Sequence, residues 1–152
     1  MTERRVLFVC THNSARSQMA EHLLRHYGGG DFEAFSTDTE ARPVRPEAVE
    51  VMAELGIDIS KQQSKTVDRY IGDSFKWVIT VCDTAREACS VFPGAASTAH
   101  WGFDDPSAAT GSDEQRLAAF RRVRDEIAGR VRLFALAEGR EQLRSADPPK
   151  SR

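Results

Sequence analysis

The sequence has 152 residues, of which 40% are hydrophobic and 29% charged, so it fits one compact domain with a single apolar core. Its 21 lysine and arginine residues nearly balance 23 acidic residues, and the net charge of −2 argues against nucleic acid or an anionic membrane as the main partner. The polar start, Met1 to Arg5, leads into a short apolar run, too short for a signal peptide or a membrane span. We therefore expect a cytoplasmic protein whose three cysteines stay reduced.

The first predicted unit is a strand followed by a helix. Residues Val6 to Cys10 form a continuous apolar run, which is typical of a strand buried on both faces. Residues Ser14 to Tyr27 then carry apolar side chains at helical spacing, and the glycines at 28–30 end this helix.

The rest of the chain continues this alternation of strands and helices. A capping box formed by Ser112 and Gln115 marks the start of a long amphipathic helix, while residues from Glu138 onward have no periodicity. We therefore expect one domain at 1–137 and a flexible C-terminal tail at 138–152. The other predicted elements are a strand at 32–36, a helix at 46–55, a strand at 76–82 and a short strand within 97–101.

Strands that alternate with helices predict an α/β fold with one parallel sheet. Right-handed crossovers favour a flavodoxin-like, four-stranded sheet of order 2-1-3-4 with helices on both faces. Ligands bind such sheets beyond the carboxyl ends of the strands, at the point where the strand order reverses. In this order the first and third strands are neighbours, and they end at Cys10 and Cys82.

The loop from Cys10 to Arg16 has the pattern of an oxyanion site. A short loop that enters a helix N-terminus turns its backbone N–H groups inward, which favours both a tetrahedral anion and a thiolate. Arg16 can hold two oxygens of the anion, while Ser17 can donate to the thiolate and Asn13 can brace the loop. A strand-end cysteine is more often a small buried hydrophobe, but the strand–loop–helix context favours a nucleophile. The predicted oxyanion-binding residues are Thr11, His12, Asn13, Ser14, Ala15, Arg16 and Ser17.

The other two cysteines, Cys82 and Cys89, form a second candidate cluster. Their spacing is too long for structural zinc and the four histidines add no paired ligands, so we expect no metal site. Each of them alone is typical of an inert thiol in a protein core, whereas the three cysteines together favour a redox function. The segment between them looks helical and would span roughly 10.5 Å, more than the ~7 Å that a disulfide allows between Cα atoms, so their pairing must unwind it.

Two aspartates precede Pro106 on the loop after the fourth strand. An Asp-Pro sequence is often only a turn, but a nucleophile that attacks a bound oxyanion needs a carboxylic acid at this edge to protonate the leaving oxygen. Spacing alone leaves both Asp104 and Asp105 open. We assign His100 and Trp101 to packing of the loop.

The segments VLFVCTHNSARSQMAEHLL, VMAELGIDIS, VCDTAREAC and HWGFDDP together resemble the thioredoxin-coupled arsenate reductases, which share the fold of low-molecular-weight protein tyrosine phosphatases. The resemblance covers about residues 4 to 136. It implies that Cys10 attacks arsenate, that Arg16 and the loop amides bind the anion, and that Asp105 is the acid. It further implies that Cys82 and Cys89 shuttle the disulfide to thioredoxin. We expect a monomer that needs no cofactor.

The sequence departs from the family pattern at several positions, of which Lys65 bears on a bound ion, and two other functions stay open. Lys65 stands where some relatives have an acidic ligand for a structural potassium ion, so we expect no such ion, although Asn13, Glu21 and Ser36 match the other ligands. A phosphatase would use the same loop and leave the second cysteine pair idle. A non-enzymatic redox sensor would use the thiols and ignore the arginine.

Overall fold

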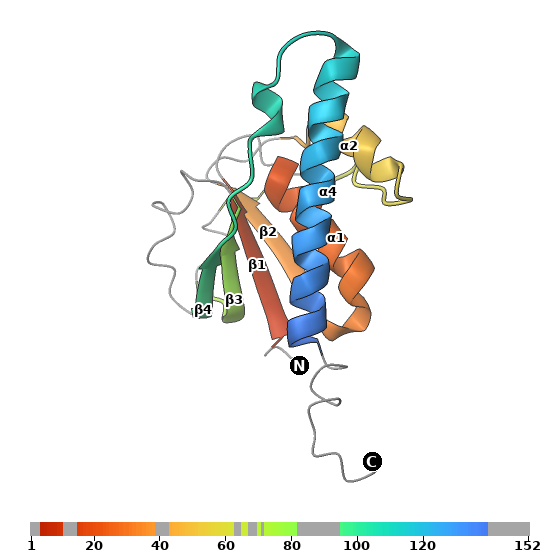
Figure 1. Cartoon of the computed structure of the whole chain (residues 1–152). Helices are drawn as coiled ribbons and strands as arrows, with labels where there is room; N and C mark the ends of the chain where they lie inside the picture. Colours follow the sequence, from red (N-terminus) through yellow and green to blue (C-terminus); the bar gives the residue numbers. More distant parts are fainter. Residues whose placement is uncertain are drawn as a thin grey trace, which may run out of the picture.

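The described part of the chain builds one four-stranded sheet. The structure is a computed structural model that describes residues 4–10, 15–38, 43–62, 65–66, 70, 72–81 and 95–139. All neighbouring strands are parallel, and their order is β2-β1-β3-β4 (Figure 1). This arrangement confirms the predicted α/β fold class and the 2-1-3-4 order. The strands are β1 (Arg5–Cys10), β2 (Glu33–Asp38), β3 (Phe75–Thr80) and β4 (Ala95–His100).

The position of β1 in the sheet follows from its sequence. Residues 6–10 are completely buried, and strands pair with β1 on both sides, so that Val9 lies opposite Thr37 of β2 and Thr80 of β3. By contrast, β4 is an edge strand of the sheet and exposes the small side chains of residues 96–99. A run of large apolar residues needs cover on both faces, and a strand inside the sheet has it.

The strand ends differ slightly from the predicted ones, and β3 shows why. The apolar run predicted a strand as far as Cys82, whereas β3 ends at Thr80. Val81 is still fully buried and donates its backbone N–H to the carbonyl of Val9, at 2.9 Å. An apolar run indicates which residues are buried, and here burial continues past the last residue of the strand.

Glycines with positive φ explain where the first two helices end. After α1 (Ala15–Gly28), Gly29 has a φ of 58° and opens a single 3-10 turn, η2 (Gly29–Asp31). α2 (Pro46–Ala53) ends two residues before the predicted Leu55, because the chain turns toward Gly56, which has a φ of 79°. Glycine adopts such angles without steric cost, so both turns are set locally by the sequence.

The long helix α4 (Asp113–Glu138) begins as predicted. The side chain of Ser112 accepts a hydrogen bond from the backbone of Gln115, whose own side chain returns to the backbone of Ser112, so the capping box is confirmed. The helix continues past Phe134 to Glu138, one residue into the predicted tail. Among the described helices, none has the combined length and apolar character of a membrane span.

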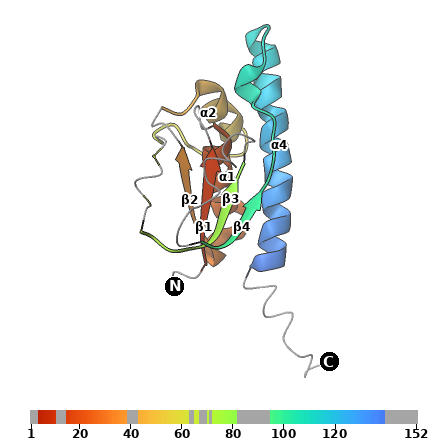
Figure 2. The same ribbon diagram turned by 90° about the vertical axis from the view of Figure 1, so that its left-hand side faces the viewer.

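Helices α1 and α4 lie side by side (Figure 1), and α4 runs along one side of the sheet (Figure 2). An aromatic cluster joins α4 to the strands: the ring of Phe134 lies 5.0 Å from Trp77, 5.7 Å from Trp101 and 5.3 Å from Phe32. Trp101 also meets Phe8 of β1 at 5.9 Å and is only 5% exposed. Trp101, the first residue after β4, was assigned to loop packing, and its ring packs into the core.

A charged bridge fastens α2 to α4. Both carboxylate oxygens of Glu54 accept hydrogen bonds from Arg121, at 2.9 and 2.7 Å, and one also accepts from Arg124 at 2.7 Å. Arg124 is buried and donates in addition to the carbonyl of Val51, at 2.8 Å. The hydrogen bonds from these two arginines, Arg121 first, lower the pKa of Glu54 to about 2.

We expect Glu54→Gln to lower the free energy of unfolding at pH 7 by about 1 kcal/mol, because it removes a partly exposed charge shared by two arginines. The folded-state pKa lies below the ordinary value of 4.5, so this stability is complete above pH 4.5 and is lost as the pH falls toward 2. Urea titrations should therefore show the difference between the two proteins shrinking from pH 4.5 to pH 3. Glu126→Gln is the control, since Glu126 pairs with Arg122 on its own helix at 3.0 Å; an equal loss there would show that the bridge between helices adds nothing.

Candidate active site

The candidate site lies at the carboxyl edge of the sheet, where the strand order reverses between β1 and β3. Cys10 is the last residue of β1 and is fully buried. Ala15 begins α1, and Arg16 and Ser17 follow in its first turn, all three buried. The structure thus brings the predicted nucleophile and the predicted anion-binding arginine to the same edge.

Two groups of predicted site residues lie outside the described part of the chain. They are the loop residues Thr11, His12, Asn13 and Ser14, and the cysteines Cys82 and Cys89. The roles given to them stay predictions.

Arg16 is held from the loop that follows β4. Its side chain is 6% exposed, and Nη1 donates a hydrogen bond to the carbonyl oxygen of Phe103 at 2.9 Å. Nη2 lies 3.7 Å from Oδ2 of Asp105. The buried Nε has no hydrogen-bond partner among the described residues. A buried guanidinium N–H without a partner is costly unless a ligand satisfies it, so the arrangement suits an anion bound beside Arg16.

The structure separates the two aspartates that the sequence left open. Asp105 faces Arg16, and its side chain is 37% exposed. Asp104 is 79% exposed and lies 3.5 Å from Arg122 of α4. Of the two, only Asp105 shares the edge with Arg16, as the resemblance implied.

The carboxyl group of Asp105 has two different sides. Its Oδ1 accepts hydrogen bonds from both the backbone N–H and the hydroxyl of Ser107, at 2.9 and 2.6 Å. Asp105 thereby caps a short 3-10 helix, η4 (Pro106–Ala108), while Oδ2 remains on the side of Arg16. The orientation of the carboxyl group is thus fixed by its own loop.

His100 lies in a strand, within the range 97–101 where the fourth strand was predicted. It is the last residue of β4, and its Nδ1 lies 2.6 Å from the hydroxyl of Thr80, the last residue of β3. The carbonyl of Thr80 also accepts a hydrogen bond from the backbone N–H of Trp101, at 2.7 Å. These bonds tie the ends of β3 and β4 together next to the site.

A buried polar cluster joins α1 to β2. The hydroxyl of Ser36 donates to Glu21 at 2.5 Å, and the other carboxylate oxygen of Glu21 pairs with Arg25 at 2.7 Å. Burial is the main reason that the pKa of the adjacent His22 lies below its ordinary value, with the charge of Glu21 acting in the opposite direction. Glu21, which matches a potassium ligand in the resemblance, is thus paired with Arg25.

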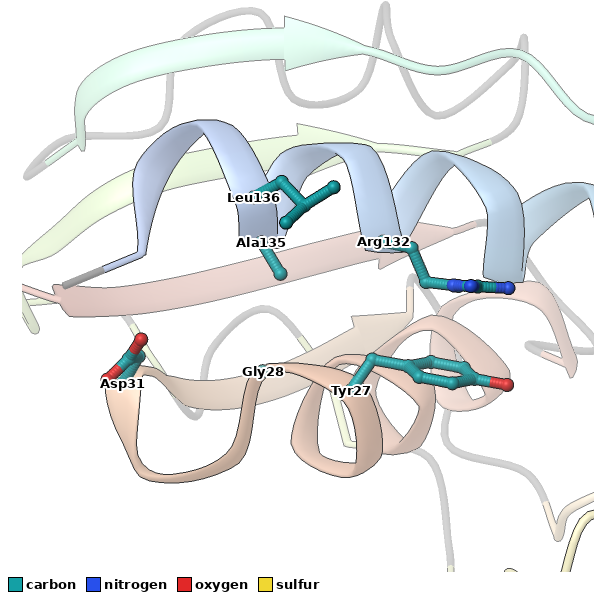
Figure 3. Close-up of a pocket in the computed structure, with 6 residues that line it drawn as sticks. All are labelled: Tyr27, Gly28, Asp31, Arg132, Ala135 and Leu136. Atoms are coloured by element: carbon teal, nitrogen blue, oxygen red, sulfur yellow. The ribbon is translucent and has the colours of Figure 1, made fainter. Parts of the chain in front are cut away.

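A separate hollow of about 280 Å³ lies near the C-terminal ends of α1 and α4 (Figure 3). The guanidinium of Arg132 lies over the ring of Tyr27, 5.2 Å from its centre. α1 starts at the carboxyl edge and reaches this hollow at its other end, so the hollow is not part of the candidate site. The residues that line it are Tyr27, Gly28, Asp31, Arg132, Ala135 and Leu136.

The sequence analysis missed two residues of the site, Phe103 and Ser107. Phe103 acts through its backbone carbonyl, for which side-chain patterns give no signal. Ser107 had a signal, because an aspartate followed by proline is a common start of a helical turn, and such a cap accepts from the residue two positions later.

The chain is similar in sequence to known proteins over most of its length. Residues 5–146 match the family of low molecular weight phosphotyrosine protein phosphatases. The arsenate reductase of Halalkalibacterium halodurans is 45% identical over 135 residues, which cover 89% of this chain and 97% of that protein. The arsenate reductase of Bacillus subtilis is 43% identical with the same coverage.

Solved structures give the same result. An arsenate reductase in its oxidised state has a TM-score of 0.71 and 31% identity, covering 87% of this chain and 96% of that one. An arsenate reductase in a phosphate-binding state has a TM-score of 0.70 and 33% identity with the same coverage. The thioredoxin-dependent arsenate reductase of Corynebacterium glutamicum has a TM-score of 0.68 and 27% identity, covering 90% of this chain and 62% of that one. The chain therefore belongs to the low molecular weight phosphotyrosine protein phosphatase family and, within it, to the group whose curated members are named arsenate reductases.

Proposed function

We propose that this protein reduces arsenate to arsenite in a thiol relay that thioredoxin regenerates. The observation that carries the proposal is the common edge of Cys10, Arg16 and Asp105, in a chain whose relatives at 43–45% identity are named arsenate reductases. These residues supply a nucleophile, an anion clamp and an acid. The solved phosphate-binding state of a 33% identical neighbour supports an oxyanion of this shape at the site.

The first step is attack on the bound oxyanion. The Cys10 thiolate forms a bond to arsenic while Asp105 protonates the departing oxygen, which leaves as water. Arg16 and the amides of residues 11–15 hold the remaining oxygens and balance their charge.

The second step transfers the electrons. The thiolate of Cys82 attacks the sulfur of Cys10, the sulfur–arsenic bond breaks, and its electron pair stays on arsenic, which leaves as arsenite. Arsenic gains two electrons, and the two thiols become a Cys10–Cys82 disulfide. No metal or organic cofactor takes part in this scheme.

The last step restores the enzyme. The thiolate of Cys89 attacks the sulfur of Cys82, the Cys10–Cys82 bond breaks, and Cys10 leaves as a thiolate. The resulting Cys82–Cys89 disulfide is reduced by exchange with a dithiol protein. The thioredoxin dependence of the Corynebacterium glutamicum neighbour supports thioredoxin as that protein. We place the protein in the cytoplasm, because the relay needs an environment that keeps thiols reduced. We further propose that it is a monomer.

The family match favours a second activity, hydrolysis of small aryl phosphates. Phosphate and arsenate share shape and charge, so the same loop, arginine and acid serve both, and Cys82 and Cys89 stay idle in hydrolysis. Thioredoxin oxidation that depends on arsenate supports the reductase, whereas aryl phosphate hydrolysis alone supports the phosphatase. If neither activity is observed, the redox sensor is the remaining function. Both assays on one preparation therefore test the proposal.

The anion clamp predicts the behaviour of Arg16→Lys. Lysine keeps the charge but loses the planar fork, so the variant should bind phosphate at least tenfold more weakly, on the order of one lost charge-assisted hydrogen bond. Phosphate should slow the alkylation of Cys10 in the wild type and do so much less in the variant. Equal protection of Cys10 in both proteins would contradict the site.

The acid role predicts the behaviour of Asp105→Asn. The variant should fold and bind phosphate normally, but arsenate turnover should fall by roughly 10²–10⁴-fold, the usual contribution of a general acid. Asp104→Asn is the matched control and should keep near wild-type turnover, because Asp104 lies against Arg122 of α4. The reverse result would assign the acid to Asp104.

The relay predicts a different endpoint for each cysteine variant after one equivalent of arsenate. Cys10→Ser should not react, Cys82→Ser should release no arsenite, and Cys89→Ser should complete one turnover and stop as a Cys10–Cys82 disulfide. The intact protein should instead collect the Cys82–Cys89 disulfide and lose helical content, because that pairing cannot span an intact helix. Peptide mapping and circular dichroism measure these outcomes. Sustained turnover of Cys89→Ser with thioredoxin would refute this order.

A further inference from the structure

The hydroxyl of Ser107 points to a role that the cap alone does not need. The backbone N–H of Ser107 already gives Asp105 the hydrogen bond that a capping aspartate requires, at 2.9 Å. The hydroxyl adds a second and shorter bond to the same oxygen, Oδ1, at 2.6 Å. Oδ1 is therefore occupied by two donors from one residue.

This double contact makes the two oxygens of Asp105 inequivalent. Because Oδ1 accepts two hydrogen bonds from Ser107, Oδ2 is the oxygen that can carry the proton while both bonds are kept. Oδ2 is the oxygen that lies 3.7 Å from Nη2 of Arg16, on the side of the anion clamp. The loop is itself anchored, because Pro106 is buried and the carbonyl of Phe103 accepts from Arg16 at 2.9 Å.

We propose that Ser107 is a positioning residue that fixes the carboxyl group of Asp105 so that Oδ2 delivers the proton to the leaving oxygen. This inference rests on the proposed function, in which Asp105 is the general acid. Without the hydroxyl, the carboxyl group keeps only one bond and can rotate, so that each oxygen faces the clamp for part of the time. Proton delivery becomes less frequent while anion binding by Arg16 is unaffected.

The test uses two aryl phosphates that differ in how much they need an acid. Phenyl phosphate has a basic leaving oxygen and depends on proton delivery, whereas p-nitrophenyl phosphate has a good leaving group and depends on it little. Ser107→Ala should lower kcat/KM for phenyl phosphate about tenfold, the worth of one hydrogen bond in the transition state, and lower that for p-nitrophenyl phosphate by less than about threefold. Inhibition by inorganic phosphate should not change. Ser107→Thr, which keeps the hydroxyl, should restore phenyl phosphate hydrolysis.

A double variant separates positioning from a structural effect. In an Asp105→Asn background, Ser107→Ala should cause no further loss, because the group that it positions no longer carries a proton. An equal loss in both backgrounds, an equal loss with both substrates, or failure of Ser107→Thr to rescue would overturn the proposal. Thermal unfolding of each variant reports any loss of folding separately.

The outcome for Ser107 can be told apart from that of the proposed function. If arsenate does not oxidise thioredoxin but the aryl phosphates show this pattern, arsenate reduction fails and the positioning role stands. If arsenate reduction occurs without aryl phosphate hydrolysis, the same variants are compared by arsenate turnover, where Ser107→Ala should again lose about tenfold only when Asp105 is present. Absence of both activities would overturn both proposals.

Discussion

The site depends on one buried guanidinium that is fixed from outside its own helix. Arg16 lies in the first turn of α1, but its hydrogen bond goes to Phe103 and its ion pair to Asp105, both on the loop after β4. Unsatisfied donors on a buried arginine are costly, so the contacts of Nη1 and Nη2 favour the loop and the helix folding against each other. The same contacts therefore bring the loop with Asp105 to the first turn of α1, at the edge of the sheet where β1 ends in Cys10.

The rest of the fold keeps the three parts of this site in register. β1 is paired on both sides, so its end cannot shift relative to β3, while Thr80 and His100 join the ends of β3 and β4. From the other side, Glu21 and Ser36 hold α1 to β2. A site formed by three separate segments needs such rigid supports, because small displacements of a catalytic group are costly in rate.

The sequence predicted the elements whose causes are local. The buried run at 6–10 predicted an inner strand, Ser112 and Gln115 predicted a helix start, and right-handed crossovers predicted the strand order. It failed where long-range contacts decide. Trp101 was assigned only to packing of its loop, because no local pattern shows that Phe134 of α4 lies against its ring. For the same reason spacing could not choose between Asp104 and Asp105, whereas the structure shows that only one of them faces Arg16.

The position of Asp105 also explains how one cation can serve two anionic groups. In the structure Arg16 uses Nη1 for a neutral carbonyl and reaches Asp105 only at 3.7 Å, so the ion pair is loose and Nε is left for a ligand. A tight, two-bond pair with Asp105 would instead occupy the fork that an oxyanion needs. The bonds from Ser107 to Oδ1 orient the carboxyl group on its own loop, with Oδ2 on the side of Arg16. The loop after β4 thus places a carboxylate beside the arginine and still leaves Nε of that arginine for a ligand.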